Sequence, residues 1–273
     1  MGLIAPAIYI DPPSVEPHRF GLYSVAITPD AVGRWENGVE YEPIAGERAS
    51  LRTYDCVDEY TGEVDLRDGE SLEESIPFIV VGSYSCKSAS RPIAEAEERA
   101  RLHLAAGEER AVELAVSTGQ MGNSPAFTDA SDITPVAGTG VSTRRAVGLL
   151  EEAVYGDSGS LGAIYGPRFA GAILNETGSI MRAQQHLETM LGTYASFGAY
   201  ANEGPEGEDA GDGFWLYATS TRPTIRRGEV FVQPDETKYL NRENNDVAVM
   251  AQRTILVSWT GLTYAILVDP AED

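Results

Sequence analysis

The chain has 273 residues, of which 42% are hydrophobic, enough to build a sizeable core, so disorder over most of its length is not expected. Its 42 acidic residues against 20 basic ones give a formal net charge of −22, which disfavours sequence-specific binding of nucleic acid and binding to anionic lipid. The sequence has no run near the roughly 20 apolar residues of a membrane span and no signal-peptide pattern at its start, so we expect a chain that stays in a cytoplasm.

Residues 1–37 predict an extended N-terminal arm. Prolines are spaced too closely for a helix and would interrupt a central strand. They are Pro6, Pro12, Pro13, Pro17 and Pro29. The arm must therefore lie on another surface, either its own domain or a neighbouring copy.

Residues 38–76 predict a long projecting hairpin. Two stretches of strand character, Leu51–Val57 and Glu63–Leu66, flank a turn at residues 58–62. Neither stretch has enough apolar residues to bury one face against a core of its own. Because an isolated two-stranded hairpin is only marginally stable in water, we expect a partner surface to support it.

A strand over Pro77–Tyr84 leads into the clearest element, a helix from Ile93 to Val116 of roughly 36 Å at about 1.5 Å per residue. A narrow apolar stripe of helical period defines this helix. Its members are Ile93, Ala96, Ala100, Leu104, Gly107, Ala111 and Leu114. Since the stripe is mostly small residues, whatever it packs on must approach closely.

The next part of the chain alternates helices and strands, which favours a small α/β domain. The expected elements are a helix from about Ser142 to Gly156, a strand Leu161–Tyr165, a helix opened by Pro167 and running through Leu174, a flexible acidic loop Asn202–Gly213, and strands Phe214–Thr219 and Glu229–Val232. The chain closes with strands Asp246–Trp259 and Leu262–Val268, joined by a turn at Thr260–Gly261. We expect the long helix to cover both closing strands.

One short motif suggests catalysis. Gly156-Asp157-Ser158-Gly159-Ser160 resembles the nucleophile segment of trypsin-like proteases, in which a histidine must lie within hydrogen-bond reach of the serine. Neither His18, in the arm, nor His103, in the long helix, has the flanking pattern of that family. We interpret the motif as the C-terminal turn of a helix and keep a serine hydrolase that uses Ser158 as the alternative of another class.

The sequence patterns give little support for a metal or cofactor site. A carboxylate cluster could hold calcium, but its spacing does not match the twelve-residue calcium loop, so a solvated loop is expected. The cluster consists of Glu206, Glu208, Asp209 and Asp212. Residues 138–140 lack the third glycine and the preceding strand of a dinucleotide site. His186 is expected on the surface of a helical stretch, and Cys56 and Cys86 are expected as reduced packing residues. We therefore expect no catalytic, cofactor-binding or metal-binding residues and no cofactor.

The order of these elements resembles the major capsid proteins of tailed phages, the Hong Kong 97-like fold that is shared with encapsulins. Three segments carry the likeness most specifically. Glu113–Pro125 resembles the end of the family's spine helix, Leu161–Ala170 is similar to a strand and proline-started helix of its axial domain, and Asn241–Arg253 resembles the stretch that re-enters the peripheral domain.

The resemblance implies an α+β fold with five parts. These are an N-terminal arm (1–37), an extended hairpin or E-loop (38–76), a first part of the peripheral domain with the spine helix (77–132), an axial domain (133–246) and closing strands of the peripheral domain (247–273). It also implies that the arm and the E-loop strap neighbouring subunits, and that copies form the pentamers and hexamers of an icosahedral shell around a DNA genome.

The implied partners are further copies of the chain, a portal, scaffold or decoration proteins, and packaged DNA held without sequence specificity; no membrane partner is expected. The implied location is the virion capsid, assembled in the cytoplasm of a bacterial host, and no enzymatic activity is expected. Some members form lysine–asparagine isopeptide links from the hairpin, but residues 38–74 contain no lysine, so no such link is expected. An encapsulin-like compartment shell remains the alternative with the same fold.

Overall fold

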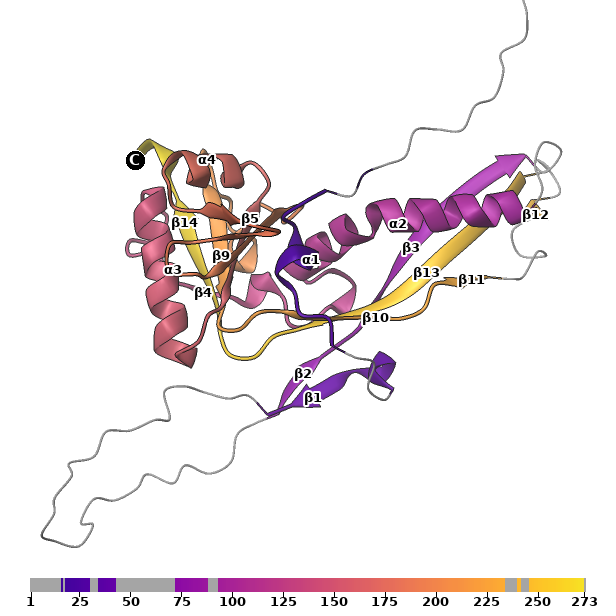
Figure 1. Cartoon of the computed structure of the whole chain (residues 1–273), viewed down its shortest axis with the longest axis horizontal. Coiled ribbons are helices and arrows are strands. Elements are labelled where there is room, and N and C mark those ends of the chain that lie inside the picture. Colours follow the sequence, from indigo (N-terminus) through magenta and orange to yellow (C-terminus); the bar gives the residue numbers. More distant parts are fainter. Residues whose placement is uncertain are drawn as a thin grey trace, which may run out of the picture.

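A computed structural model of the chain describes residues 16, 18–29, 34–42, 72–87, 93–233, 240–241 and 246–272. The molecule is elongated, with a compact sheet-and-helix unit at one end and a long helix lying along narrow strands at the other (Figure 1). The expected strands Leu51–Val57 and Glu63–Leu66 and most of the expected arm before residue 18 lie outside the described residues. Among the helices that the structure describes, none is long and apolar enough to cross a membrane.

The extended unit is built on one helix and two long strands. Helix α2 runs from Ile93 to Thr118, which confirms the predicted long helix. It lies along β3 (Phe78–Lys87) and β13 (Asp246–Ser258), which pair antiparallel over ten residues of each strand. Short strands pair with the other edge of β13 and complete a five-stranded sheet within the described part of the chain. They are β10 (Thr224–Arg227), β11 (Phe231–Val232) and β12 (Leu240–Asn241).

Small residues let the first half of α2 approach this sheet closely. Ala96, Ala100 and Leu104 are buried in a core shared with β3 and β13. A Cβ atom at Gly82 of β3 would lie 2.4 Å from the backbone nitrogen of Leu104, so only glycine fits there without moving the helix. The close approach expected from the apolar stripe is confirmed at Ala96, Ala100 and Leu104, whereas Ile93, the first predicted member, is exposed.

The second half of α2 departs from the predicted stripe. Gly107, Ala111 and Leu114 are exposed, whereas Glu108 and Glu113 face inward. A stripe drawn through apolar residues alone could not follow the buried face here, because glutamate is rarely buried and was assigned to the solvent side.

The compact unit contains a mixed sheet, which in the described residues has seven strands in the order β4-β14-β9-β5-β8-β7-β6. Their bounds are β4 Ser131–Asp132, β5 Ala163–Pro167, β6 Met181–Ala183, β7 His186–Glu188, β8 Tyr194–Gly198, β9 Phe214–Thr219 and β14 Thr263–Val268. Helices α3 (Thr143–Ser158) and α4 (Ala170–Glu176) bury apolar side chains against one face of this sheet. The small α/β unit expected from the sequence is therefore present.

Residues alternate between two cores along the central strands of this sheet. In β9, Phe214 and Leu216 pack with α3 and α4, whereas Trp215 and Tyr217 belong to the core that contains α2 and β13. Every residue of β9 is buried, as expected for a strand covered on both faces. The compact unit and the extended unit are thus joined by one continuous apolar core.

Two expectations about the later chain are wrong. Only β13 returns to the long helix, since β14 pairs with β9 in the seven-stranded sheet. The strands β10, β11 and β12 fall within the expected axial segment 133–246, yet they pair with β13. Both errors have one cause: strand periodicity shows which residues turn inward but does not show which sheet a strand joins. A third expectation is wrong for a separate reason: Pro167 is the last residue of β5 and does not open α4, which begins at Ala170.

The base of the expected hairpin is formed by two short strands. β1 (Val39–Tyr41) pairs antiparallel with β2 (Glu73–Ser75), so the two ends of segment 38–76 lie side by side (Figure 1). The Tyr41 hydroxyl donates to the carbonyl of Trp259 at 2.5 Å, which fixes this base to the end of β13.

Candidate functional site

Residues 18–27 lie against their own chain. Helix α1 (Leu22–Val25) buries Leu22 and Val25 in the core near the C-terminal half of α2. The Ile27 N–H donates to the Pro223 carbonyl at 2.8 Å, and the Ile27 carbonyl accepts from Ile225 at 2.9 Å. The expectation that the whole arm straps a neighbouring subunit is therefore wrong for this segment, which we call the arm clasp (residues 18–27).

Glu113 of α2 is the central anchor of the arm clasp. Its side chain is fully buried, and its two carboxylate oxygens accept hydrogen bonds from opposite sides. The Leu22 N–H donates to Oε1 at 2.9 Å, and the Ala199 N–H, just beyond β8, donates to Oε2 at 2.7 Å. One carboxylate thus ties together the long helix, the arm clasp and the seven-stranded sheet, with charge-assisted hydrogen bonds stronger than those between neutral groups.

Two glycines make room for this carboxylate. A Cβ atom at Gly21 would lie 2.4 Å from Glu113 Oε1, and one at Gly198 would lie 2.2 Å from the same oxygen. Neither glycine has a positive φ angle, so the requirement is for space and not for an unusual backbone conformation. Any larger residue at either position would displace the arm clasp or β8 from α2.

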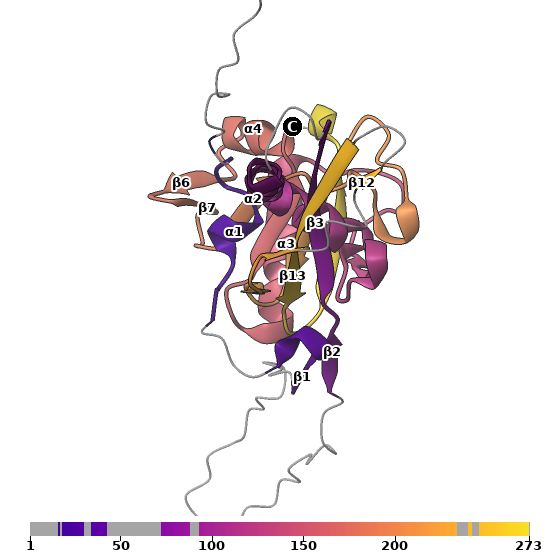
Figure 2. The same cartoon turned by 90° about the vertical axis from the view of Figure 1, so that its right-hand side faces the viewer.

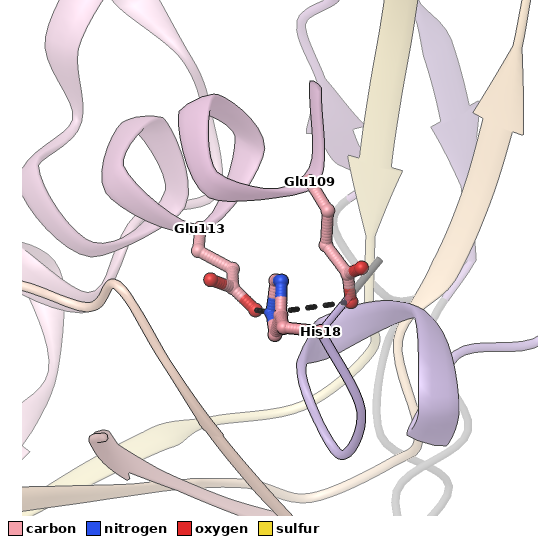
Figure 3. Close-up of side chains that lie close together, drawn as sticks. All are labelled: His18, Glu109 and Glu113. Carbon is pink, nitrogen blue, oxygen red and sulfur yellow. Dashed lines mark hydrogen bonds and ion pairs between the residues drawn. The ribbon is translucent and has the colours of Figure 1, made fainter. Parts of the chain in front are cut away.

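Glu109 and His18 complete this cluster (Figure 3). The Tyr23 N–H donates to Glu109 Oε1 at 3.0 Å, and His18 Nε2 lies 3.3 Å from Glu113 Oε1 and 3.8 Å from Glu109 Oε1. Burial raises the pKa of the Glu109 carboxyl above its ordinary value, while the Tyr23 N–H and His18 oppose that shift. The His18 ring lies beside two carboxyl groups that would repel each other when both are ionised.

Glu108 holds a second set of contacts on the same turn of α2. Arg253 of β13 and Arg227 of β10 each lie 2.6 Å from one of its oxygens, and the Tyr23 hydroxyl donates to Oε1 at 2.9 Å. Burial, followed by the charge of Glu108, raises the pKa of the Tyr23 hydroxyl well above its ordinary value. The helix is thereby tied to two strands and to the arm clasp.

The three donor atoms of His18, Glu109 and Glu113 lie within 4.8 Å of one another, a spacing that invites a test for a metal ion. The point that a Gly21 Cβ would occupy lies 2.4 to 2.6 Å from all three. That point is only about one C–C bond, or 1.5 Å, from the Gly21 Cα atom, so an ion there would collide with the backbone. The donor set therefore fits an anchor for the chain and does not fit a metal ion in this arrangement.

The residues of the protease-like motif form a helix end. Ser158 is the last residue of α3, and Gly159 caps it in the left-handed conformation at φ +64°. The Ser158 hydroxyl lies 3.1 Å from the Val154 carbonyl and 2.9 Å from the Ser220 carbonyl, and both can accept from it. None of the described histidines forms a hydrogen bond with Ser158.

The other sequence candidates lie apart from the cluster. Residues 203–212 form a turn in which the Gly204 N–H donates to the Glu208 carbonyl at 2.6 Å, so the loop expected to be flexible is hydrogen-bonded to itself. Its carboxylates form no group with metal-ligand spacing. His186 begins β7 and lies 3.1 Å from Glu188, so the helical stretch expected there is wrong. His103 lies in α2, as expected, with its Nδ1 atom 2.9 Å from the carbonyl oxygen of Ser83. Cys56 lies outside the described residues, so the redox state of the cysteines remains a prediction.

Reasoning from sequence did not identify the anchoring glutamates as site residues. One signal was available: continuing the buried positions 100 and 104 by four residues reaches Glu108 and then Val112. A glutamate on the buried line of a helix indicates a polar partner brought from elsewhere, because an unpaired buried charge is costly.

Comparison with solved structures gives likeness over nearly the whole chain. A chain from Microbacterium phage Oxtober96 is 14% identical, covers 98% of this chain and 97% of its own length, and has a TM-score of 0.55. The capsid of a native GTA particle with C5 symmetry is 12% identical, with 97% and 95% covered and a TM-score of 0.57. A chain from Gordonia phage Cozz is 12% identical, with 98% and 89% covered and a TM-score of 0.52. No protein-family model and no curated protein matches the chain. The likeness confirms the predicted α+β capsid fold.

Proposed function

We propose that this chain is the major capsid protein of a tailed bacteriophage, and that its copies form the pentamers and hexamers of an icosahedral shell around the DNA genome. The observation that carries the proposal is the end-to-end likeness to the capsid of a native GTA particle, with 97% of this chain and 95% of the other covered. A likeness of this extent includes both sheets and the long helix, so it is not a shared fragment. The match to a phage chain over 98% of this chain points the same way.

Within this proposal each part of the chain has a mechanical role. The five-stranded sheet with α2 is the peripheral domain, with α2 as its spine, and the seven-stranded sheet with α3 and α4 is the axial domain around fivefold and sixfold centres. The E-loop leaves from the β1–β2 base and straps a neighbour, and any strap made by the arm precedes residue 18. Each interface can be modest, of order 1,600 Å², because a subunit meets several neighbours and escapes only by breaking them together.

The negative charge of the chain suits a shell that must not bind its packaged DNA tightly. At −22 the average surface repels phosphate, so packaged DNA would be held without sequence specificity. Assembly in the bacterial cytoplasm, with a portal and with scaffold or decoration proteins as partners, belongs to the same proposal. The absence of enzymatic activity also belongs to this proposal. It is supported by the contacts of the Ser158 hydroxyl with two backbone carbonyls, those of Val154 and Ser220.

The test is assembly of the purified full chain, followed by light scattering and negative-stain imaging. We expect closed particles or capsomers far larger than the 29.4 kDa monomer. A monodisperse monomer at high concentration would overturn the proposal. Shells purified from their source that contain one cargo protein and no DNA would instead favour the encapsulin-like compartment.

A second measurement addresses the alternative of another class. A fluorophosphonate probe should leave the native chain unlabelled, and the Ser158→Ala variant serves as the matched control. Labelling of the native chain that is lost in the variant would support the serine hydrolase.

A further inference from the structure

A row of exposed apolar side chains lies at one end of the seven-stranded sheet. Strands β14 and β5 both begin beside Thr219, the last residue of β9, and β8 begins beside the first residue of β5. The residues just before these three strands therefore lie at the same end of the sheet. Four of them are apolar and more than half exposed, namely Leu262, Leu161, Met190 and Leu191.

Helix α3 adds a fifth side chain to this row. The Thr189 hydroxyl donates to the Glu151 carboxylate, which ties the turn before β8 to the helix. Tyr155 lies one turn further along the same side of α3 and is 72% exposed. Exposed apolar side chains of a monomer are normally scattered, so five of them at one end of a sheet indicate a surface that another molecule covers. We call these five residues the apolar edge.

The residues of the protease-like motif hold the apolar edge in place. The Asp157 carboxylate accepts hydrogen bonds from the Ser220 hydroxyl and from the Leu262 N–H, the latter at 3.1 Å. The hydroxyls of Ser158 and Ser160 lie 2.9 and 3.0 Å from the Ser220 carbonyl, which can accept from both. These contacts fix the end of α3 to the segments after β9 and before β14. Because the edge is already ordered, its docking would lose little conformational entropy.

Helix α3 carries opposite charges along its length, in the reverse of the order that its dipole favours. Arg144 and Arg145 lie in its first turn, whereas Glu151, Glu152 and Asp157 lie in its second half, near the apolar edge. The helix dipole favours acidic residues near the start and basic residues near the end. Neither arginine, nor Glu152, forms an ion pair with a side chain that the structure describes. Each end of α3 thus carries charge that a single copy does not balance.

The start of α3 lies at the end of the compact unit opposite the apolar edge. Val141, just before α3, pairs with Val268 at the end of β14, whereas Asp157 contacts Leu262, just before β14 begins. Figure 1 is viewed down the shortest axis and shows α4 at the top of this unit and the turn between β13 and β14 at its bottom. Figure 2, turned about the vertical axis, keeps α4 at the top and the β1–β2 base at the bottom. Copies that lie side by side in one thin layer can therefore bring the two ends into contact.

The surface at the start of α3 has the side chains of an interface. The Arg144 Nε–H donates to the Thr177 carbonyl at 3.0 Å, which places this arginine beside the end of α4. Phe169 lies between the end of β5 and the start of α4, is 51% exposed, and packs edge-on against the buried ring of Phe214. Arginine and aromatic side chains are enriched at protein interfaces. We call Arg144, Arg145 and Phe169 the receiving surface.

We propose that the apolar edge of one copy binds the receiving surface of the next copy around a capsomer ring. The inference rests on the proposed shell function and names a contact by which copies recognise each other. The leucines of the edge bury their surface against Phe169 and the apolar stems of the arginines, while the acidic end of α3 faces the guanidinium groups. Since the two surfaces differ, the contact is head to tail and closes into a ring when the rotation between copies allows it.

The position of the β1–β2 base agrees with this contact. The base is fixed to the carbonyl of Trp259, three residues before Leu262 of the apolar edge, and lies on the same side of the molecule (Figure 1). The strap proposed for the E-loop would therefore leave toward the neighbour that the apolar edge meets.

The experiment alters one surface at a time in the full chain. Leu161→Asp with Leu191→Asp should lower the particle yield by at least about tenfold, because docking would bury two unpaired carboxylates. Arg144→Glu with Arg145→Glu should lower it as strongly, since like charges would then meet. Light scattering and imaging of equal amounts of protein measure the yield, and circular dichroism checks that each chain is folded.

Each variant has a matched control with the same change of charge. Leu102→Asp with Met121→Asp alters two exposed apolar residues outside the seven-stranded sheet, and Arg101→Glu with Arg110→Glu alters two exposed arginines of α2. Both controls should assemble like the native chain. Equal losses in a variant and its control would overturn the contact, because the effect would then follow net charge and not position.

A mixture of the two defective chains tests the head-to-tail arrangement. The aspartate variant keeps its receiving surface and the glutamate variant keeps its apolar edge, so one contact can form between them but no ring can close. At the concentration at which the native chain assembles, analytical ultracentrifugation should show pairs in the mixture and monomers for each variant alone. Pairs of the glutamate variant alone, or no pairs in the mixture, would overturn the contact.

Two further outcomes keep the proposals separate. A native chain that stays monomeric overturns the shell function together with this contact, whereas native shells with unaffected variants overturn the contact alone. If the aspartate variant fails to fold, Met190→Ser with Leu191→Ser decides the question, since these are the most exposed residues of the apolar edge with Tyr155. A lowered yield supports the contact, and a native yield overturns it.

Discussion

The two halves of α2 are held in place in different ways. The first half packs on β3 through Ala96, Ala100 and Leu104, with Gly82 allowing the backbones to approach. The second half also buries Val112, Ala115 and Val116 in the same core. In addition it is fixed by Glu108, Glu109 and Glu113, whose carboxylates accept hydrogen bonds from the arm clasp and from the backbone just beyond β8. Apolar packing is not directional, whereas each carboxylate contact demands one position of its partner.

This difference separates strength from specificity. The stability that the first half contributes comes from close packing of small side chains, so it depends on side-chain volume. The carboxylates of the second half determine where the arm clasp and β8 lie. The stability that they contribute depends on complete pairing of each buried charge. We expect substitutions of Glu108 and Glu113 to have the larger effects, because loss of either carboxylate leaves another charge or N–H group buried and unpaired.

The largest effect is expected at Glu108. Alanine there leaves Arg253, and in part Arg227, without a counter-charge, and removal of one partner from a buried ion pair costs roughly 3–5 kcal/mol. Urea unfolding of the full chain at one protein concentration measures the change. Glu98→Ala, at an exposed position in the first half, should stay within about 0.5 kcal/mol. Equal losses in the two variants would contradict the comparison.

The next effect is expected at Glu113. Glu113→Ala leaves the N–H groups of Leu22 and Ala199 without their acceptor, at a cost of about 2–4 kcal/mol. Release of the arm clasp should also make the bond after Arg19 sensitive to trypsin. Glu113→Gln keeps one acceptor oxygen and should lose less. Unchanged cleavage after Arg19 in the alanine variant would show that this carboxylate does not hold the segment.

A smaller effect is expected where the first half approaches β3. Gly82→Ala forces its methyl group against the backbone of Leu104 and should cost about 1–3 kcal/mol. Gly107→Ala, in the same helix but with no atom within 4 Å of the added methyl group, should stabilise by about 0.5–1 kcal/mol. Thermal unfolding of the two variants measures both changes. The same sign for both would argue against close packing at Gly82.

The smallest effect is expected at Glu109 and should depend on pH. Because burial raises its pKa in the folded chain, ionised Glu109 opposes folding above that pKa, and the penalty fades as the pH falls toward and below the ordinary value of 4.5. Glu109→Gln should therefore be more stable than the native chain near pH 7 and should lose this advantage near pH 4. Unfolding curves of both chains across this range provide the measurement. A difference that does not vary with pH would contradict the assignment.

Much of the fold could be predicted because helices and strands produce a regular spacing of apolar residues over short stretches of sequence. The stripe through Ala96, Ala100 and Leu104 located the helix, and the alternation along 246–259 located the long strand. The destination of β14 could not be predicted, because its apolar residues would suit either sheet. The site was missed for a related reason: Glu108 and Glu113 read as solvent-facing when only apolar residues count as buried.

The sequence by itself determined which segments become helices and strands and, for apolar residues, which side turns inward, since both follow from backbone geometry over a few residues. Tertiary structure alone decided which distant groups meet. Glu113 and Leu22 are 91 positions apart, and Glu108 and Arg253 are 145 apart. The physical reason is that a buried carboxylate is stable only with its donors in place, and those donors reach it by the path of the whole chain.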